Sequence, residues 1–130
     1  MYVTGSAGQA SGLNEYATIG YGAATGHQLW LANYRTAQAN DNAAGLAVSP
    51  DGSTVYVTGT STASSSTTAD YATVAYGATG GAQLWSARYA VTGAQNNAAG
   101  VVVSGGNAII TGTSGPFGSQ SDFATVAYQG

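Results

Sequence analysis

Few side chains in this chain of 130 residues carry groups that can do chemistry. Lys and Arg number 2, Asp and Glu number 5, and there is one His and no Cys. Three of the carboxylates, Glu15, Asp70 and Asp122, recur at one position, just before a strand-like segment. A ring of such carboxylates could contact a cation. The alternative, which we favour because the residue recurs in every repeat, is that each carboxylate accepts hydrogen bonds from backbone N–H groups of the preceding loop.

Catalysis and metal binding have weaker support. Repeat-related carboxylates have the same sequence surroundings, so no pair is distinguished as an acid and a base. His27 is the only histidine and lies in a glycine-rich turn, where we interpret it as a solvated residue. Asp41-Asn42 and Asn96-Asn97 offer too few carboxylates for a calcium loop and are interpreted as turn or strand-entry caps. We predict no catalytic residue, no cofactor and no metal.

The low charge narrows the range of partners. Charged residues make up 5% of the chain, whereas about 25% is usual in soluble domains. Arg35 and Arg88 are the only cations, so no basic patch can neutralise phosphates and we predict no nucleic-acid partner. No apolar run approaches the roughly 18 residues of a membrane helix, so no membrane span is expected. The absence of Cys excludes a disulfide scaffold and cysteine-ligated zinc.

The elements that must position these side chains follow an internal repeat. Four short segments recur at offsets of 52 to 55 residues. Each is rich in Val, Ile, Thr, Tyr and Trp and is bounded by Gly, Asn, Asp or Ser, which predicts strands and no helix. The predicted strands are 16–21, 71–76 and 123–128; 28–34 and 83–89; 44–49 and 99–104; and 2–4, 54–58 and 108–111.

The two faces of these strands indicate how a sheet would pack. In 71–76, Ala72, Val74 and Tyr76 alternate with Tyr71, Thr73 and Ala75, and neither face is charged. That pattern predicts a sheet covered on both faces.

The connections also alternate in length. Short turns (22–27, 77–82 and the Pro50-Asp51-Gly52 turn) alternate with longer loops at 6–14, 35–41, 60–69, 90–96 and 113–121. In an up-and-down meander, all the long loops fall at one end, which is where binding is expected. Phe117 is the only aromatic residue in these loops and is the predicted contact for a protein or glycan ligand.

A repeat of four strands and about 54 residues predicts an all-β fold of β-propeller blades, each a four-stranded antiparallel meander. A tandem all-β sandwich is the alternative. We expect one propeller segment over 1–130, with complete blades at 15–59 and 70–112. Residues 1–5 would be the outer strand of a preceding blade and 122–130 the first strand of a third. Two blades and two remnants cannot close a ring, which predicts a fragment of a larger propeller.

The repeated residues resemble a known family. The acidic-Tyr/Phe-Ala-Thr-Val-x-Tyr segment, with Val48-Ser-Pro-Asp-Gly52 followed by Val55-Tyr-Val-Thr-Gly59, resembles bacterial β-propeller repeats of the SBBP and quinoprotein-like (PQQ-like) kind. The resemblance implies a non-catalytic scaffold or an interaction module of an exported, periplasmic or cell-surface protein. The alternative is a fragment of a quinoprotein-like oxidoreductase or propeller hydrolase whose catalytic residues lie outside this chain.

The aromatic residues are also interpreted as parts of propeller blades. Thr25-Gly26 and Trp30 match only part of the tryptophan-docking turn of quinoprotein blades, so no cofactor is expected. Trp30 and Trp85 are interpreted as wedges between blades. The recurring Tyr21, Tyr76 and Tyr128 are structural repeat positions. Open blade faces would be covered by the remaining blades of a longer chain or by self-association.

Overall fold

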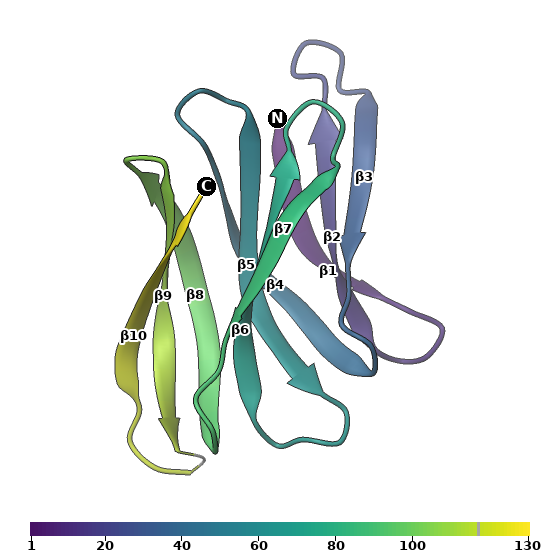
Figure 1. Ribbon diagram of the computed structural model, residues 1–130. Coiled ribbons are helices and arrows are strands. Elements are labelled where there is room, and N and C mark those ends of the chain that lie inside the picture. Colours follow the sequence, from purple (N-terminus) through teal and green to yellow (C-terminus); the bar gives the residue numbers. More distant parts are fainter. Residues whose placement is uncertain (117) are drawn as a thin grey trace.

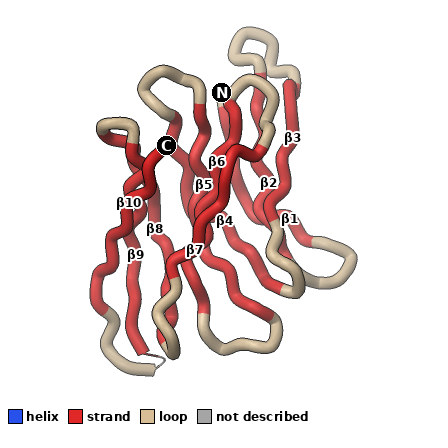
Figure 2. The backbone as a smooth tube through the Cα atoms, viewed as in Figure 1, coloured by secondary structure: helices blue, strands red, loops and turns tan. Residues whose placement is uncertain are grey.

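The computed structural model describes residues 1–116 and 118–130. These residues form strands, turns and loops without a helix, as Figures 1 and 2 show. The predicted all-β class is therefore confirmed. The ten strands are β1 (Tyr2–Gly8), β2 (Asn14–Tyr21), β3 (Gln28–Tyr34), β4 (Ala39–Val48), β5 (Thr54–Ala63), β6 (Ala69–Gly77), β7 (Gln83–Tyr89), β8 (Ala94–Ser104), β9 (Asn107–Pro116) and β10 (Asp122–Gln129).

The strands form three antiparallel sheets that lie side by side (Figure 1). The first sheet has the order β1-β2-β3, the middle sheet β4-β5-β6-β7 and the third sheet β10-β9-β8. Strands that are consecutive in the chain pair with each other, except β3 with β4 and β7 with β8. We call the packing between the first and middle sheets the first joint, and that between the middle and third sheets the second joint.

The predicted assignment of strands to sheets was wrong. The ranges 15–59 and 70–112 are each divided between two sheets, because the chain changes sheet after β3 and after β7. At the first change, the Ala39 N–H donates to the Thr36 carbonyl and the Asp41 carboxylate accepts from the Thr36 N–H. This turn directs β4 out of the first sheet. β5 and β6, in contrast, stay paired as far as Thr62 and Ala69 and form a hairpin.

The loops predicted to be long are shorter than expected because the strands are longer. β5 continues to Ala63 and β9 to Pro116, beyond the predicted limits of 58 and 111. The additional residues of β5 include Thr60 and Thr62, and β-branched residues fit a paired strand well. Successive connections were predicted to lie at alternate ends of the strands. Figure 2 shows the loops gathered at these two ends.

Both faces of the middle sheet are covered, as its uncharged pattern predicted. Residues 71–76 of β6 are at most 1% exposed. One face packs against Tyr16 and Trp30 of the first sheet, and the other against Ala98 and Ile110 of the third. Burying a large aliphatic or aromatic side chain contributes about 1.5–3 kcal/mol, so this sheet is the centre of the fold.

A threonine pair recurs in every sheet. The hydroxyls are 3.0 Å apart in Thr4–Thr18 and in Thr58–Thr73, and 3.1 Å apart in Thr111–Thr125. Thr58 and Thr73 are completely buried, and their hydroxyls satisfy each other. These two hydroxyls therefore lie inside the stack without an unpaired group.

The two joints share one further contact between sheets, which we call the tyrosine–glycine contact. The Tyr16 hydroxyl donates to the Ala72 carbonyl at 3.1 Å. The hydroxyl passes over Gly59, and a Cβ added at Gly59 would lie 2.8 Å from the Tyr16 hydroxyl oxygen. In the second joint, the Tyr71 hydroxyl donates to the Ala124 carbonyl at 3.2 Å. It passes over Gly112, where an added Cβ would also lie 2.8 Å from the tyrosine hydroxyl oxygen. Each tyrosine needs the space that its glycine leaves.

Gly59→Ala is therefore expected to lower the free energy of unfolding by about 1–3 kcal/mol, because the new methyl group would also clash with the Asn42 carbonyl oxygen. Gly5→Ala is the matched control. It occupies the same repeat position in the first sheet, where nothing lies within 4 Å, and should change stability by less than about 0.5 kcal/mol. Urea unfolding of both variants checks this, and equal effects would contradict the contact.

Candidate functional site

A row of polar side chains crosses the middle sheet near one end of its strands. Asp41 on β4 is in register with Ser61 on β5, which is in register with Asp70 on β6. Arg88 of β7 completes the row. Its guanidinium is 2.8 Å from the Asp70 carboxylate and donates to the Ser61 hydroxyl at 2.9 Å and to the Thr36 hydroxyl at 3.1 Å. One cation thus joins three strands to the connection that leaves the first sheet.

The buried members of this row have structural partners. Asp41 is completely buried and accepts from the Thr36 N–H through Oδ2, while its Oδ1 has no hydrogen-bond partner among the described residues. Its counterpart Asn96 is also completely buried. The Asn96 amide donates to the Ala69 carbonyl at 2.9 Å and accepts from the Ser114 hydroxyl at 2.6 Å. Both residues lie within strands, and Asp41 also caps the turn before β4.

Two of the three recurring carboxylates accept hydrogen bonds from side chains of the next strand. Glu15 accepts from the Asn33 amide at 2.7 Å, and Asp70 is paired with Arg88. The predicted donors were backbone N–H groups, and the side-chain donors were missed. Asn33 and Arg88 occupy one repeat position, and this correspondence was the available signal. Asp122 accepts no hydrogen bond from the described residues, and within 1–116 and 118–130 no group of three or more His, Cys, Asp or Glu is placed to hold a metal.

The two tryptophans lie in the two joints. The Trp30 ring is 5.7 Å from that of Tyr2 and 6.3 Å from that of Tyr76, and its Nε1–H donates to the Ala78 carbonyl at 2.9 Å. In the second joint, Trp85 lies 5.9 Å from Tyr56 and 5.8 Å from Tyr128.

Each tryptophan therefore connects an aromatic ring of its own sheet to one of the next sheet. Tyr21, which corresponds to Tyr76 and Tyr128, is half-buried in the first sheet.

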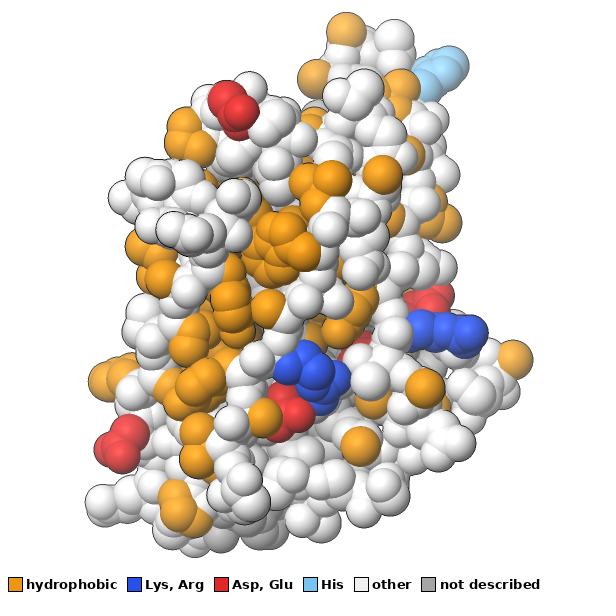
Figure 3. Space-filling view, in the orientation of Figure 1, with side chains coloured by type: hydrophobic (Ala, Val, Ile, Leu, Met, Phe, Trp, Pro, Cys, Tyr) orange, Lys and Arg blue, Asp and Glu red, His pale blue; other side chains and the backbone are white. Residues whose placement is uncertain are grey.

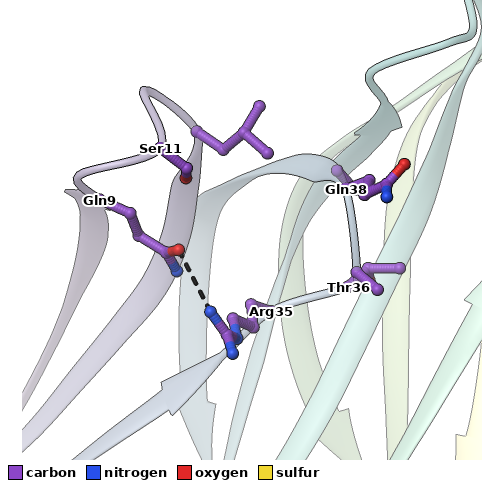
Figure 4. A pocket seen from close by; sticks show the side chains of 8 residues that line it. Gln9, Ser11, Arg35, Thr36 and Gln38 are labelled. Atoms are coloured by element: carbon purple, nitrogen blue, oxygen red, sulfur yellow. Dashed lines mark hydrogen bonds between the residues drawn. The ribbon is translucent and has the colours of Figure 1, made fainter.

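A pocket of about 400 Å³ lies between the β1–β2 loop and the β3–β4 connection. Figure 4 shows the side chains of Gln9 and Arg35 pointing toward each other at one side of the pocket, where the guanidinium donates to the Gln9 amide oxygen at 3.3 Å. Ser11, Thr36 and Gln38 add further polar groups. Leu13, Ala37 and Ala39 complete the lining, which is therefore mixed, and no aromatic ring is among the residues that line the pocket.

Two sequence predictions, Phe117 as a ligand contact and His27 as a solvated turn residue, have different outcomes. Phe117, the predicted ligand contact, lies outside the described residues. His27 lies exposed in the turn between β2 and β3. Figure 3 shows that charged side chains are few and scattered on the displayed face.

Comparison of the chain with protein-family models, curated proteins and solved structures gave no match. Among the described residues, no helix has the length and apolar character needed to cross a membrane.

Burial shifts the titration of the joint tyrosines. It raises the pKa of Tyr16 well above its ordinary value of 10.0, and the nearby negative charge of Asp41 adds to the shift. Burial likewise raises the pKa of Tyr76. In the turn at the other end of the middle sheet, hydrogen bonds from Ser49 and Ser53 lower the pKa of Asp51 to about 2.

The stability of the chain should therefore fall in alkaline solution. The unfolded chain loses the Tyr16 proton near its ordinary pKa of 10.0, whereas the folded chain retains it. Stabilisation is complete below about pH 10 and decreases above it by up to about 1.4 kcal/mol per pH unit for each such tyrosine. Tyr16→Phe should lower the free energy of unfolding by about 0.5–1.5 kcal/mol at neutral pH and make the alkaline decrease less steep.

Phe123→Tyr is the matched control, because Phe123 occupies the same repeat position and is 92% exposed. A hydroxyl there would ionise equally in the folded and unfolded states and leave the pH dependence unchanged. Urea unfolding between neutral pH and about pH 11 measures the slopes. Parallel curves for the parent chain and Tyr16→Phe would contradict the assignment.

Proposed function

We propose that this chain is a non-catalytic scaffold and interaction segment of the β-propeller type, in which each sheet is a blade. The observation that supports this most is a difference in exposure between equivalent positions of the three sheets. Repeat positions whose side chains are buried inside the two joints have exposed side chains on the two outer faces. By the resemblance of its repeats, we further propose that the segment belongs to an exported or cell-surface bacterial protein.

The outer face of the first sheet corresponds to a covered face of the other two. Val3, Ile19 and Leu31 are in register across its three strands, and Val3 is 48% and Leu31 52% exposed. Val57 and Ile110, which occupy the repeat position of Val3, are completely buried in the joints. This face therefore has the same kinds of side chain as a sheet face inside a joint, but no sheet covers it.

The outer face of the third sheet corresponds to the other side of a joint. Phe123 is 92% exposed, whereas Tyr16 and Tyr71 at its repeat position are completely buried. Thr125 is exposed, whereas its counterparts Thr18 and Thr73 are buried. Since the two outer faces match the two sides of one joint, a further sheet of the same kind should stack on either end. Such a contact is head-to-tail, with different surfaces on its two sides.

The connections at one end of the strands supply the second part of the proposed role. The pocket between Gln9 and Gln38 offers amide, hydroxyl and guanidinium groups to a protein or glycan ligand. A rigid sheet scaffold that carries binding residues on its loops is a common arrangement. No specific observation in the described ranges favours the oxidoreductase or hydrolase alternative, which stays a prediction from resemblance.

The test of this proposal is the association of the 130-residue chain in analytical ultracentrifugation. We expect the average mass to increase with protein concentration, because each copy has one face of each kind. Val3→Glu on one outer face and Thr125→Glu on the other should each give a monomer, since a buried unpaired charge is strongly unfavourable. Leu84→Glu, at a residue of the middle sheet that is 56% exposed, is the control and should still associate.

Mixing the two blocked variants discriminates between kinds of contact. A head-to-tail contact predicts a dimer of one Val3→Glu chain with one Thr125→Glu chain, because each retains the face that the other lacks. A contact between identical faces predicts that one variant pairs with itself. Either that result, or a parent chain that stays monomeric at about 1 mM, would contradict the proposal.

A further inference from the structure

We propose that the free edge of β10 is a binding site for an extended strand of a partner polypeptide, and that the partner strand carries Arg followed by Tyr. β10 pairs with β9 on one edge only, whereas its counterparts β2 and β6 are paired on both edges. The second neighbours of those counterparts are β3 and β7, which have the related sequences QLWLANY and QLWSARY. An edge strand offers a row of backbone donors and acceptors that a partner strand can pair with.

The exposed ring of Phe123 indicates one side chain of the partner. The rings of Tyr16 and Tyr34 lie 5.3 Å apart in the first sheet, and those of Tyr71 and Tyr89 lie 5.2 Å apart in the middle sheet. These residues are directly opposite each other in register. Phe123 occupies the same position on β10 and is 92% exposed. An aromatic residue opposite Phe123 would recreate the pair.

The carboxylate of Asp122 indicates the residue before that aromatic. Glu15 accepts from Asn33, and Asp70 from Arg88, and both donors come one residue before the paired tyrosine. Asp122 occupies the same repeat position, is the first residue of β10 and is exposed, with no hydrogen bond from the described residues. Because its charge is negative, Arg is the residue that fits best there, as it does opposite Asp70.

The surface beside this edge is apolar. Figure 3 shows hydrophobic side chains gathered between β10 and β7 on the displayed face. The partly buried residues of the second joint include Trp85, Tyr89 and Tyr128. Trp30, the counterpart of Trp85, is only 7% exposed and is covered by the turn at Gly81, where an added Cβ would lie 2.6 Å from the indole. No described residue takes that place over Trp85.

The probe for this site is the peptide Gln-Leu-Trp-Ser-Ala-Arg-Tyr, capped at both ends and carrying a fluorophore on a flexible linker. Fluorescence anisotropy with the complete 130-residue chain should show saturable 1:1 binding, and a scrambled peptide should not bind. Asp122→Asn should weaken binding about threefold, and Phe123→Ala about fivefold. Glu15→Gln is the matched control at a carboxylate whose neighbouring strand is present, and it should leave the affinity unchanged.

Two further measurements define the contact. Replacing the peptide Arg by Gln should remove most of the difference between the parent chain and Asp122→Asn, as expected if these two groups interact directly. Amide hydrogen exchange should become slower in β10 when the peptide is bound and should not change in β1. Absence of saturable binding up to about 1 mM, or binding that is insensitive to both Asp122→Asn and Phe123→Ala, would overturn the proposal.

The strand site is distinguishable from stacking of whole sheets. Val3→Glu blocks the outer face of the first sheet, which is remote from β10 in the stack, so this variant should bind the peptide with the affinity of the parent chain. Peptide binding without association of the chain would support the edge site alone. Association without peptide binding would leave the stacking proposal intact and contradict the edge site.

Discussion

The middle sheet has a neighbouring sheet on each face, and this two-sided burial constrains the rest of the molecule. A charge on either face would have to be desolvated without a partner, which is strongly unfavourable. The charged residues of that sheet accordingly lie in one polar row, where Arg88 binds Asp70 and Ser61 and the buried Asp41 accepts from the Thr36 N–H. Thr58 and Thr73 are tolerated in the interior because their hydroxyls bond to each other. The low charge of the sequence has a structural cause.

The tyrosine–glycine contact shows how two covered faces fit closely. Tyr16 and Tyr71 each reach across a joint to a carbonyl of the next sheet, and each passes a glycine that leaves the necessary space. At the outer ends the same repeat positions lose this environment. Gly5 has nothing near its missing side chain, and Phe123 extends into solvent. One repeated sequence therefore produces a covered joint inside the stack and an open half-joint at each end.

Much of this arrangement could be predicted from the sequence, with clear limits. The alternation of residues 71–76 predicted both covered faces, because strand geometry alone decides which side chains share a face. The division of strands into sheets could not be predicted in the same way. It depends on where the chain leaves a sheet, and the turn before β4 is fixed by Asp41 and Thr36, whose interaction has no repeated sequence pattern. The roles of Asn33 and Arg88 were missed because residues of different charge occupy one repeat position.

Amide hydrogen exchange in the isolated chain tests the central claim most directly, because it reports the stability of each strand separately. If two-sided burial of the middle sheet organises the fold, amides of β5 and β6 should exchange only through global unfolding. Those of β1 and β10, at the free edges of the outer sheets, should exchange much faster. Equal protection of all the strands, or faster exchange in β5 and β6 than in β1 and β10, would contradict the account.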